Sequence, residues 1–254
     1  YKLNNNYINL INVECKKLNK KFSSKFTNEY ITNSFDLAIN LIKSKFSNKL
    51  INGPINKKSF LNKKFLGITE YIAAKCNAKK IGMLIYNKNL SVCPLTTHLP
   101  IKLVAKKITK KLIQEKIVLI NRFFKKNFKY YPRIAVTGLN PHCESILKFN
   151  EDEKILNNAI NSQKRIGINV KGPFAADTIF LKRNREKFDV ILGMYHDQVL
   201  TPIKALFEFD AFNITMGLPF LRITPDHGPN QSMVGKNTSN PISLIKAINF
   251  LDKN

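Results

Sequence analysis

The chain has 254 residues, of which 44% are hydrophobic and 23% charged, which allows one large domain or two small ones with enough apolar side chains for a core. This composition excludes a disordered chain, and no apolar run approaches the ~20 residues of a membrane span, which excludes a transmembrane protein. The formal net charge of +25 leaves a nucleic-acid partner open as one interpretation.

Apolar periodicity predicts helices and strands that alternate along the chain. A helix is expected over 27–46, two buried strands over 79–87 and 91–98 with a turn at Asn87–Asn89, and a long basic helix over 101–128. Beyond Pro132 we expect strands over 133–140, 167–172, 188–196 and 213–219, and helices near 151–165, 176–187, 198–208 and 241–252. Such alternation is typical of an α/β protein with a largely parallel sheet.

The positive charge lies mostly in the first half, where residues 1–130 hold 27 Lys and Arg against 5 Asp and Glu. Only six of the 42 basic residues are arginine, although nucleic-acid readers favour arginine with interleaved aromatic residues. We therefore interpret the charge as a solvated lysine surface and expect no nucleic-acid partner. A non-catalytic, basic nucleic-acid-binding protein is the alternative from a different class.

Common motifs of several protein classes are missing from the sequence. The four cysteines show no CxxC spacing, which favours a reducing environment and a cytoplasmic location. Neither a G-x-G-x-x-G fingerprint, a P-loop nor a G-x-S-x-G elbow occurs.

All four histidines, His98, His142, His196 and His227, closely follow apolar, strand-like runs. In α/β folds the loops after strands carry ligands and catalytic groups. Three neutral imidazoles from separate loops suit a catalytic metal with one position open for water or substrate. The pattern therefore indicates a metal site, with structural histidines as the alternative.

A second group of residues suits an anionic ligand. Lys204, Asn213 and Arg222 follow His196 along the chain, and together they could hold a phosphate or a carboxylate. Surface charge is the alternative for the lysine, whereas Arg222 stands between apolar residues.

Longer motifs link the chain to a known family. They are GPINK (53–57), GITE (67–70), TTHLPI (96–101), GLNPH (138–142), GPFAADT (172–178), MYHDQ (194–198), NITMGLPFLR (213–222) and DHG (226–228). With them, the chain resembles the 4-hydroxythreonine-4-phosphate dehydrogenase family of vitamin B6 biosynthesis from about Gly53 to the C-terminus. The resemblance fades before about residue 50, so we expect the family's N-terminal segment to be missing.

The resemblance implies a reaction and its cofactors. The reaction is the NAD-dependent oxidation, with decarboxylation, of 4-phosphooxy-L-threonine to 3-amino-2-oxopropyl phosphate. One divalent metal per site is implied, zinc first and magnesium or cobalt as alternatives, with the site completed across the interface of a homodimer.

The resemblance also implies which residues of this chain do the work. The metal ligands would be His98, His142 and His196, and the acidic catalytic positions Asp177 and Asp197. Substrate contacts map onto Thr69, Lys204, Asn213 and Arg222. The segment 227–241 is similar to the dinucleotide-binding stretch of isocitrate and isopropylmalate dehydrogenases, which implies cofactor contacts from His227, Gly228, Gly235 and Asn240.

The family's fold implies two α/β lobes around a cleft that holds the active site. We expect residues 1–66 with 215–254 to form one lobe and residues 67–214 the second. Two departures bear on the substrate: Ile68 stands where the family usually has a substrate-contacting histidine, and the acidic stretch 143–153 replaces a Gly-rich loop. They leave open a sibling dehydrogenase for another phosphorylated hydroxy acid, such as 4-phospho-threonate or 4-phospho-erythronate.

Overall fold

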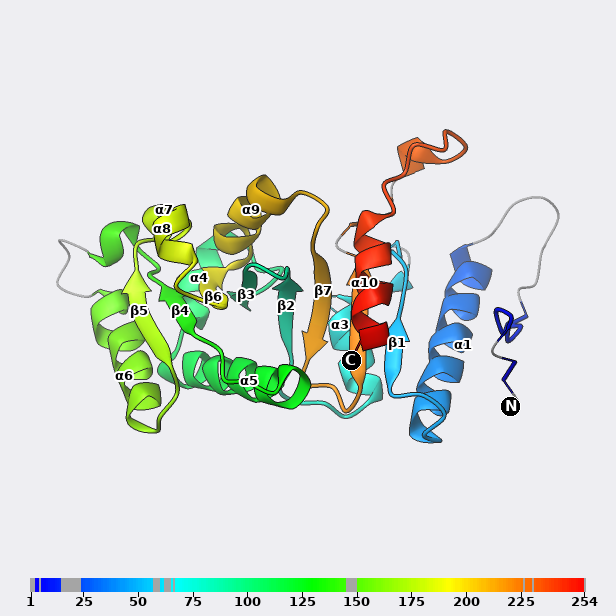
Figure 1. Ribbon diagram of the computed structural model, residues 1–254, viewed down its shortest axis with the longest axis horizontal. Coiled ribbons are helices and arrows are strands. Elements are labelled where there is room, and N and C mark those ends of the chain that lie inside the picture. Colours follow the sequence, from blue (N-terminus) through cyan, green and yellow to red (C-terminus); the bar gives the residue numbers. More distant parts are fainter. Residues whose placement is uncertain are drawn as a thin grey trace.

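The computed structural model describes residues 3–4, 6–14, 24–56, 60–61, 65, 67–144, 150–225, 227–229 and 231–253. Within them the chain forms one eight-stranded sheet in the order β1-β8-β7-β2-β3-β6-β4-β5 (Figure 1). The strands are β1 (Lys49–Ile51), β2 (Gly82–Tyr86), β3 (Ser91–Thr96), β4 (Ile134–Thr137), β5 (Val170–Phe174), β6 (Val190–Tyr195), β7 (Phe212–Met216) and β8 (Leu221–Pro225). Four of the seven pairings are parallel, which confirms a mixed α/β fold with a largely parallel sheet.

Helices cover both faces of this sheet and its β1 end. They are α1 (Ser24–Lys43), α3 (Ile68–Lys75), α4 (Ile101–Lys107), α5 (Lys110–Phe128), the 3-10 turn η1 (Pro141–Cys143), the π-helix η2 (Asp152–Leu156), α6 (Asn157–Arg165), α7 (Ala176–Ile179), α8 (Lys182–Arg185), α9 (His196–Phe207), the 3-10 turn η3 (Gln231–Met233) and α10 (Ile242–Lys253). In Figure 1, α1 lies beside β1 at one end and α6 beside β5 at the other. The segment that carries η3 extends away from the sheet before the chain returns in α10.

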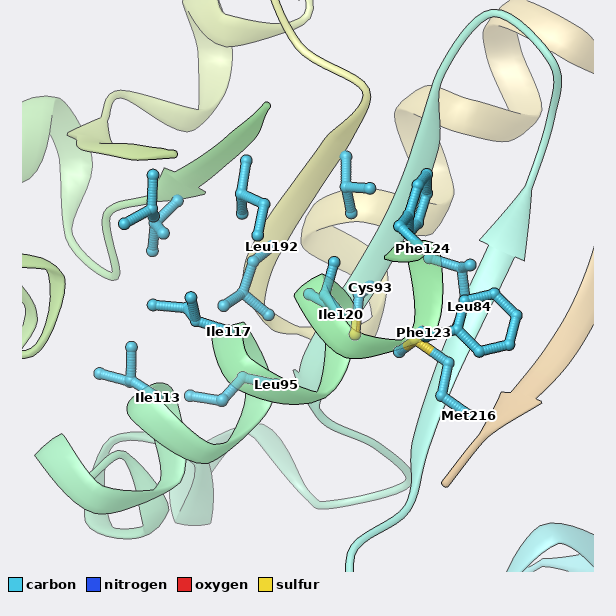
Figure 2. Packing of buried hydrophobic residues seen from close by; sticks show 14 of the residues in the cluster. Leu84, Cys93, Leu95, Ile113, Ile117, Ile120, Phe123, Phe124, Leu192 and Met216 are labelled. Carbon is cyan, nitrogen blue, oxygen red and sulfur yellow. The ribbon is translucent and has the colours of Figure 1, made fainter. Parts of the chain in front are cut away.

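The largest core cluster lies between α5 and the sheet. Ile113, Ile117 and Ile120 recur at helical spacing along α5 and are fully buried, as the apolar stripe of an amphipathic helix requires. Figure 2 shows them against side chains from β3 and β6, such as Leu95 and Leu192. Burying each such side chain contributes roughly 1.5–3 kcal/mol. The lysines of α5 lie mostly on its outer face, and no helix in the described part of the chain combines the length and apolarity needed to cross a membrane.

Two further clusters complete the core. Neighbouring residues of a strand point to opposite faces, so Ile191 packs against Val199 and Ile203 of α9 on the face opposite α5. At the β1 end, α1, α3 and the turn before β8 share a third cluster that includes Phe35 and Phe220. This end supports one wall of the candidate site described below.

Several predicted elements differ from the structure. The single helix expected over 101–128 is two helices, because Ile108 is extended and Thr109 caps α5 by accepting a hydrogen bond from the Leu112 backbone N–H at 3.2 Å. The helix expected over 176–187 is divided into α7 and α8 at the extended residue Leu181. The strand expected over 213–219 ends at Met216. β1 and α3 were not predicted, and β8 was noted only as the strand-like run before His227.

Candidate active site

The four histidines follow strands, as the sequence indicated. His98 comes after β3, His142 after β4 and His196 directly after β6. Since β3, β6 and β4 are parallel neighbours, their carboxyl ends meet at one edge of the sheet. Three antiparallel pairings separate β3 from β8, so His227 follows a strand that runs in the opposite direction.

His98 and His196 form a pair at this edge. Their ring centroids lie 6.0 Å apart, and N–metal bonds of about 2.1 Å would allow two rings at this spacing to reach one ion. Asp197 Oδ1 accepts a hydrogen bond from His196 Nδ1 at 2.6 Å, which leaves Nε2 as the free donor atom, the usual arrangement at metal-bound histidines. His98 also has a backbone φ of 54°. Such conformations are uncommon overall and cluster at functional sites.

His142 lies in a separate turn after β4. Its φ is 57°, and the φ of Cys143 is 62°. Burial chiefly, and the carboxylates of Asp152 and Asp177 in addition, raise the pKa of the Cys143 thiol, so Asp177 belongs to the surroundings of this turn. Among the described residues, no three His, Cys, Asp or Glu side chains gather into a metal-holding group. One chain therefore brings together two of the three predicted ligands.

A cleft of about 700 Å³ contains most of the predicted site. Seven predicted residues line it: Thr69, His98, His196, Asn213, Arg222, His227 and Gly228. They come from α3, from the ends of β3 and β6, from β7 and from β8 with the turn that follows it. The fold thus brings predicted metal, substrate and cofactor residues to one cavity.

Arg222 is the most constrained of these residues. Only 2% of it is exposed, and its guanidinium donates to Asn52 Oδ1 at 2.9 Å, to Thr69 Oγ1 at 3.0 Å and to Thr215 Oγ1 at 2.8 Å. Burial lowers the pKa of Arg222 to about 10, an effect that the charge of Glu70 opposes. The side chain is therefore a fixed cation at neutral pH, suited to an anionic group.

Strand alternation explains why polar groups face this cleft. Ile214 and Ile223 belong to the core cluster under α5, so the alternating residues Asn213, Thr215 and Arg222 point to the other face. The register pairs Thr215 with Arg222. Asn213 Oδ1 is buried without a hydrogen-bond partner, which suits a donor group on a bound ligand.

Sequence reasoning missed two residues that orient the arginine, Asn52 and Thr215. Asn52 directly precedes the GPINK motif, and Thr215 stands two positions after Asn213 in the same strand. The period-two spacing was a usable signal for Thr215. The contact of Asn52 depends on the parallel pairing of β1 with β8, which no local pattern reveals.

Other predicted residues do not line the cleft. Lys204 lies in α9 with Nζ 6.0 Å from the centroid of the Phe209 ring. Asn240 accepts a hydrogen bond from the Ile242 backbone N–H at 2.9 Å and so caps α10, and Gly235 has a φ of 76° in the extended segment. Asp197 is mostly exposed beside His196.

Ile68, where the family usually has a histidine, lies in the wall of the cleft and also belongs to the third core cluster. Only 6% of it is exposed. This part of the wall therefore offers apolar contact where a hydrogen-bond donor was the family expectation.

A mixed α/β fold with a buried arginine, a buried amide oxygen and paired imidazoles around one cleft is suited to binding a small anionic ligand. A family model described as "Pyridoxal phosphate biosynthetic protein PdxA" matches residues 2–251, and the chain belongs to this family. The match also corrects the expectation that the similarity fades before residue 50. Residues 24–43 form an amphipathic helix, which carries no short motif by which it could be recognised.

Curated relatives agree with the family. The chain is 40% identical over 231 residues to the 4-hydroxythreonine-4-phosphate dehydrogenase of Sulfurihydrogenibium sp. (strain YO3AOP1), covering 89% of this chain and 71% of the relative. It is 37% identical to the enzyme of that name from Xanthobacter autotrophicus, covering 85% of this chain and 64% of the relative. These names confirm, at the level of the family, an oxidoreductase of pyridoxal phosphate biosynthesis.

Solved structures show the same likeness. A putative 4-hydroxythreonine-4-phosphate dehydrogenase from Salmonella typhimurium superposes with a TM-score of 0.78 at 28% identity, over 90% of this chain and 71% of that one. An isocitrate dehydrogenase from Methylococcus capsulatus reaches a TM-score of 0.52 at 11% identity, over 86% of this chain and 70% of that one. The second likeness concerns the fold alone, and it agrees with the isocitrate dehydrogenase-like fold that was expected.

Proposed function

We propose that the chain catalyses the NAD-dependent oxidation, with decarboxylation, of 4-phosphooxy-L-threonine to 3-amino-2-oxopropyl phosphate. One observation carries this proposal: Thr69, Asn213 and Arg222 share a single cleft with His98 and His196. Membership of the family and the names of the relatives support it.

The substrate is an anion with hydrogen-bond donors, and the cleft offers complementary groups. Arg222 is held by three hydrogen bonds, so its guanidinium meets a phosphate or carboxylate without losing much conformational freedom on binding. The unpaired Oδ1 of Asn213 accepts a hydrogen from the substrate's hydroxyl or ammonium group. Lys204 adds positive charge as the substrate enters.

The donor set fits one divalent ion, zinc by preference, with magnesium or cobalt as alternatives. His98 and His196 of one chain would hold it together with His142 of the partner subunit, in a homodimer. When bound, the metal stabilises negative charge on the substrate oxygen and NAD accepts the hydride. Asp197 holds the His196 ring by its Nδ1–H, and Asp177 lies near the His142 turn, where it could receive or pass on a proton.

The remaining parts of the proposal concern the cofactor, the two lobes and the cellular location. NAD would contact His227 and Gly228 in the cleft, and Gly235 and Asn240 in the segment between η3 and α10. The cleft would separate a lobe of residues 1–66 and 215–254 from a lobe of residues 67–214, and the enzyme would work in the cytoplasm.

The test is NADH formation from 4-phosphooxy-L-threonine by the full chain, with and without a chelator, followed by addition of zinc, magnesium or cobalt. We expect turnover that the chelator removes and one of these metals restores. Turnover that is unaffected by the chelator would contradict the metal site. No turnover with any of the three metals would contradict the assigned substrate.

Ile68 favours a second candidate, a sibling dehydrogenase for 4-phospho-threonate or 4-phospho-erythronate. An apolar residue in the cleft wall changes which polar groups of a substrate can be satisfied there. Turnover of these acids above that of 4-phosphooxy-L-threonine would favour the sibling. Equal or better turnover of the threonine phosphate would reject it.

A further inference from the structure

Asp152 is a fully buried carboxylate that the proposed reaction leaves without a role. It belongs to the acidic stretch that follows His142, and none of its surface is exposed. A buried carboxylate is costly unless hydrogen bonds compensate its charge, so its partners indicate what it is for.

In the part of the chain that the structure describes, every hydrogen bond that the Asp152 carboxylate accepts comes from one turn. The backbone N–H of Leu139 donates to Oδ1 at 2.6 Å and that of Asn140 to Oδ2 at 3.0 Å, while Asn140 Nδ2 donates to Oδ2 at 2.9 Å. The turn is also closely packed at Gly138, where a Cβ would lie 2.8 Å from Asp152 Oδ1 and 2.6 Å from Cys143 Sγ and would displace these side chains. Asp152 therefore fixes the backbone just before His142.

Gln198 connects this turn to the helix that begins with His196. Its Nε2 donates to the Gly138 carbonyl at 2.8 Å. Its Oε1 accepts from Thr137 Oγ1 at 2.8 Å and from the Met194 backbone N–H at 2.7 Å. One amide thus joins the end of β4 to the end of β6, so the backbone just before His142 is held against the central strands of the sheet.

The His142 turn has a conformation that requires such support. His142 and its successor Cys143 both have positive φ, and uncommon backbone conformations persist only where the surroundings over-determine them. Three hydrogen bonds to the buried carboxylate of Asp152 and one from the partly buried amide of Gln198 provide that restraint.

We propose that Asp152 and Gln198 are positioning residues, which hold the turn of residues 138–142 so that His142 is presented as a metal ligand. This inference rests on the proposed function, because it assigns the purpose of the turn to the metal site. Neither side chain touches the metal or the substrate in this assignment.

The test compares Asp152→Asn and Gln198→Glu with Asp189→Asn in the full chain. Asp152→Asn keeps the shape of the side chain but removes its charge. Its NH₂ group would face a backbone N–H, so two donors would meet and one hydrogen bond would be lost. Gln198→Glu keeps the acceptor for Met194 and loses the donor to Gly138. The control Asp189 also joins β4 to β6, through Arg133 N–H at 2.7 Å, but at the opposite ends of the strands.

Two measurements separate positioning from plain stability. Amide hydrogen exchange over residues 138–142 reports the anchor, and Co²⁺ titration with its visible spectrum reports the ligand set. We expect faster exchange and about 10-fold weaker Co²⁺ affinity in both variants, as for residues that orient metal ligands. Their kcat should fall with little change in KM, while Asp189→Asn should keep the wild-type exchange over 138–142, Co²⁺ affinity and kcat.

The outcomes are distinct. Faster exchange with unchanged Co²⁺ affinity and spectrum would overturn the inference and make the anchor merely structural, as would unchanged exchange in both variants. If Asp152→Asn fails to fold, Gln198→Glu decides by the same criteria. A wild-type chain that binds Co²⁺ but does not oxidise 4-phosphooxy-L-threonine would contradict the proposed substrate. Hydrogen exchange and Co²⁺ titration would then still decide whether Asp152 and Gln198 are positioning residues.

Discussion

The imidazole rings of His98 and His196 lie 6.0 Å apart, one just beyond β3 and the other at the first residue of α9. Sheet register brings them together, because β3 and β6 pair in parallel with Thr96 opposite Tyr195. Thr96 Oγ1 also donates to the Met194 carbonyl at 2.8 Å, which ties the two strand ends together. The pair is therefore a rigid feature of the sheet edge.

Replacing either ring tests this pair as a metal site. His98→Ala and His196→Ala should each remove bound metal and turnover, because two remaining imidazoles hold a divalent ion weakly. Metal content measured by elemental analysis and NADH formation check the result. Thermal unfolding of the metal-free variants is the control: His196 lies at a partly exposed site, so the midpoint should stay close to that of the metal-free wild type. Full metal content in either variant would reject the ligand assignment.

Arg222→Lys tests the anion site while preserving the charge. Lysine cannot reproduce the contacts to Asn52, Thr69 and Thr215 that orient the guanidinium, nor its forked geometry toward an anion. Each charged hydrogen bond to the substrate that is lost costs about 1.5–3 kcal/mol of binding. We expect the KM for the phosphorylated substrate to rise by about 10-fold or more. Arg133→Lys is the matched control, since Arg133 pairs with the partly exposed Asp189 outside the cleft, and it should leave KM unchanged. An unchanged KM in Arg222→Lys would contradict the anion site.

The difference between what was predicted and what was missed follows from the kind of information each residue required. His98 and His196 were predictable because each follows a clearly apolar run, and Arg222 because a lone arginine stands among apolar residues. Asn52 and Thr215 become partners of Arg222 only through the pairing of β8 with β1 and β7. The strand β8 was recognised only as the apolar run before His227, and its pairing with β1 and β7 could not be read from the sequence. Asp152 was noted only as one residue of the acidic stretch 143–153. Its burial could not be predicted, because it depends on the hydrogen bonds that Asp152 accepts from a turn earlier in the chain.

Ile68→His tests how the cleft wall selects its substrate. A histidine there would restore a donor for a phosphate oxygen, worth about 1.5–3 kcal/mol of binding. It would also place a polar ring in the apolar cluster that contains Ile68, so the free energy of unfolding should fall by about 1–3 kcal/mol. We expect a lower KM for 4-phosphooxy-L-threonine in a less stable protein, measured by steady-state kinetics and urea unfolding.

Ile72→Val controls for the packing loss, because Ile72 belongs to the same cluster, is fully buried and does not line the cleft. It should lower stability without changing KM. If Ile68→His leaves KM unchanged or raises it, the isoleucine does not limit phosphate binding, and the wall is already suited to the substrate of this chain.

The buried thiol of Cys93 predicts a pH dependence of stability. Cys93 lies in β3 with no exposed surface, and burial raises its pKa from 9.0 to about 11, although the charge of Lys116 opposes the shift. The folded state therefore holds the thiol proton more tightly than the unfolded state. The resulting stabilisation is complete below pH 9 and is lost as pH rises toward 11. Its size is on the order of 2 kcal/mol.

Cys93→Val removes the titrating group with little change in volume, so wild type should lose stability relative to this variant between pH 8 and about 10.5. Urea unfolding across this range measures the difference, and parallel curves for the two proteins would contradict the raised pKa.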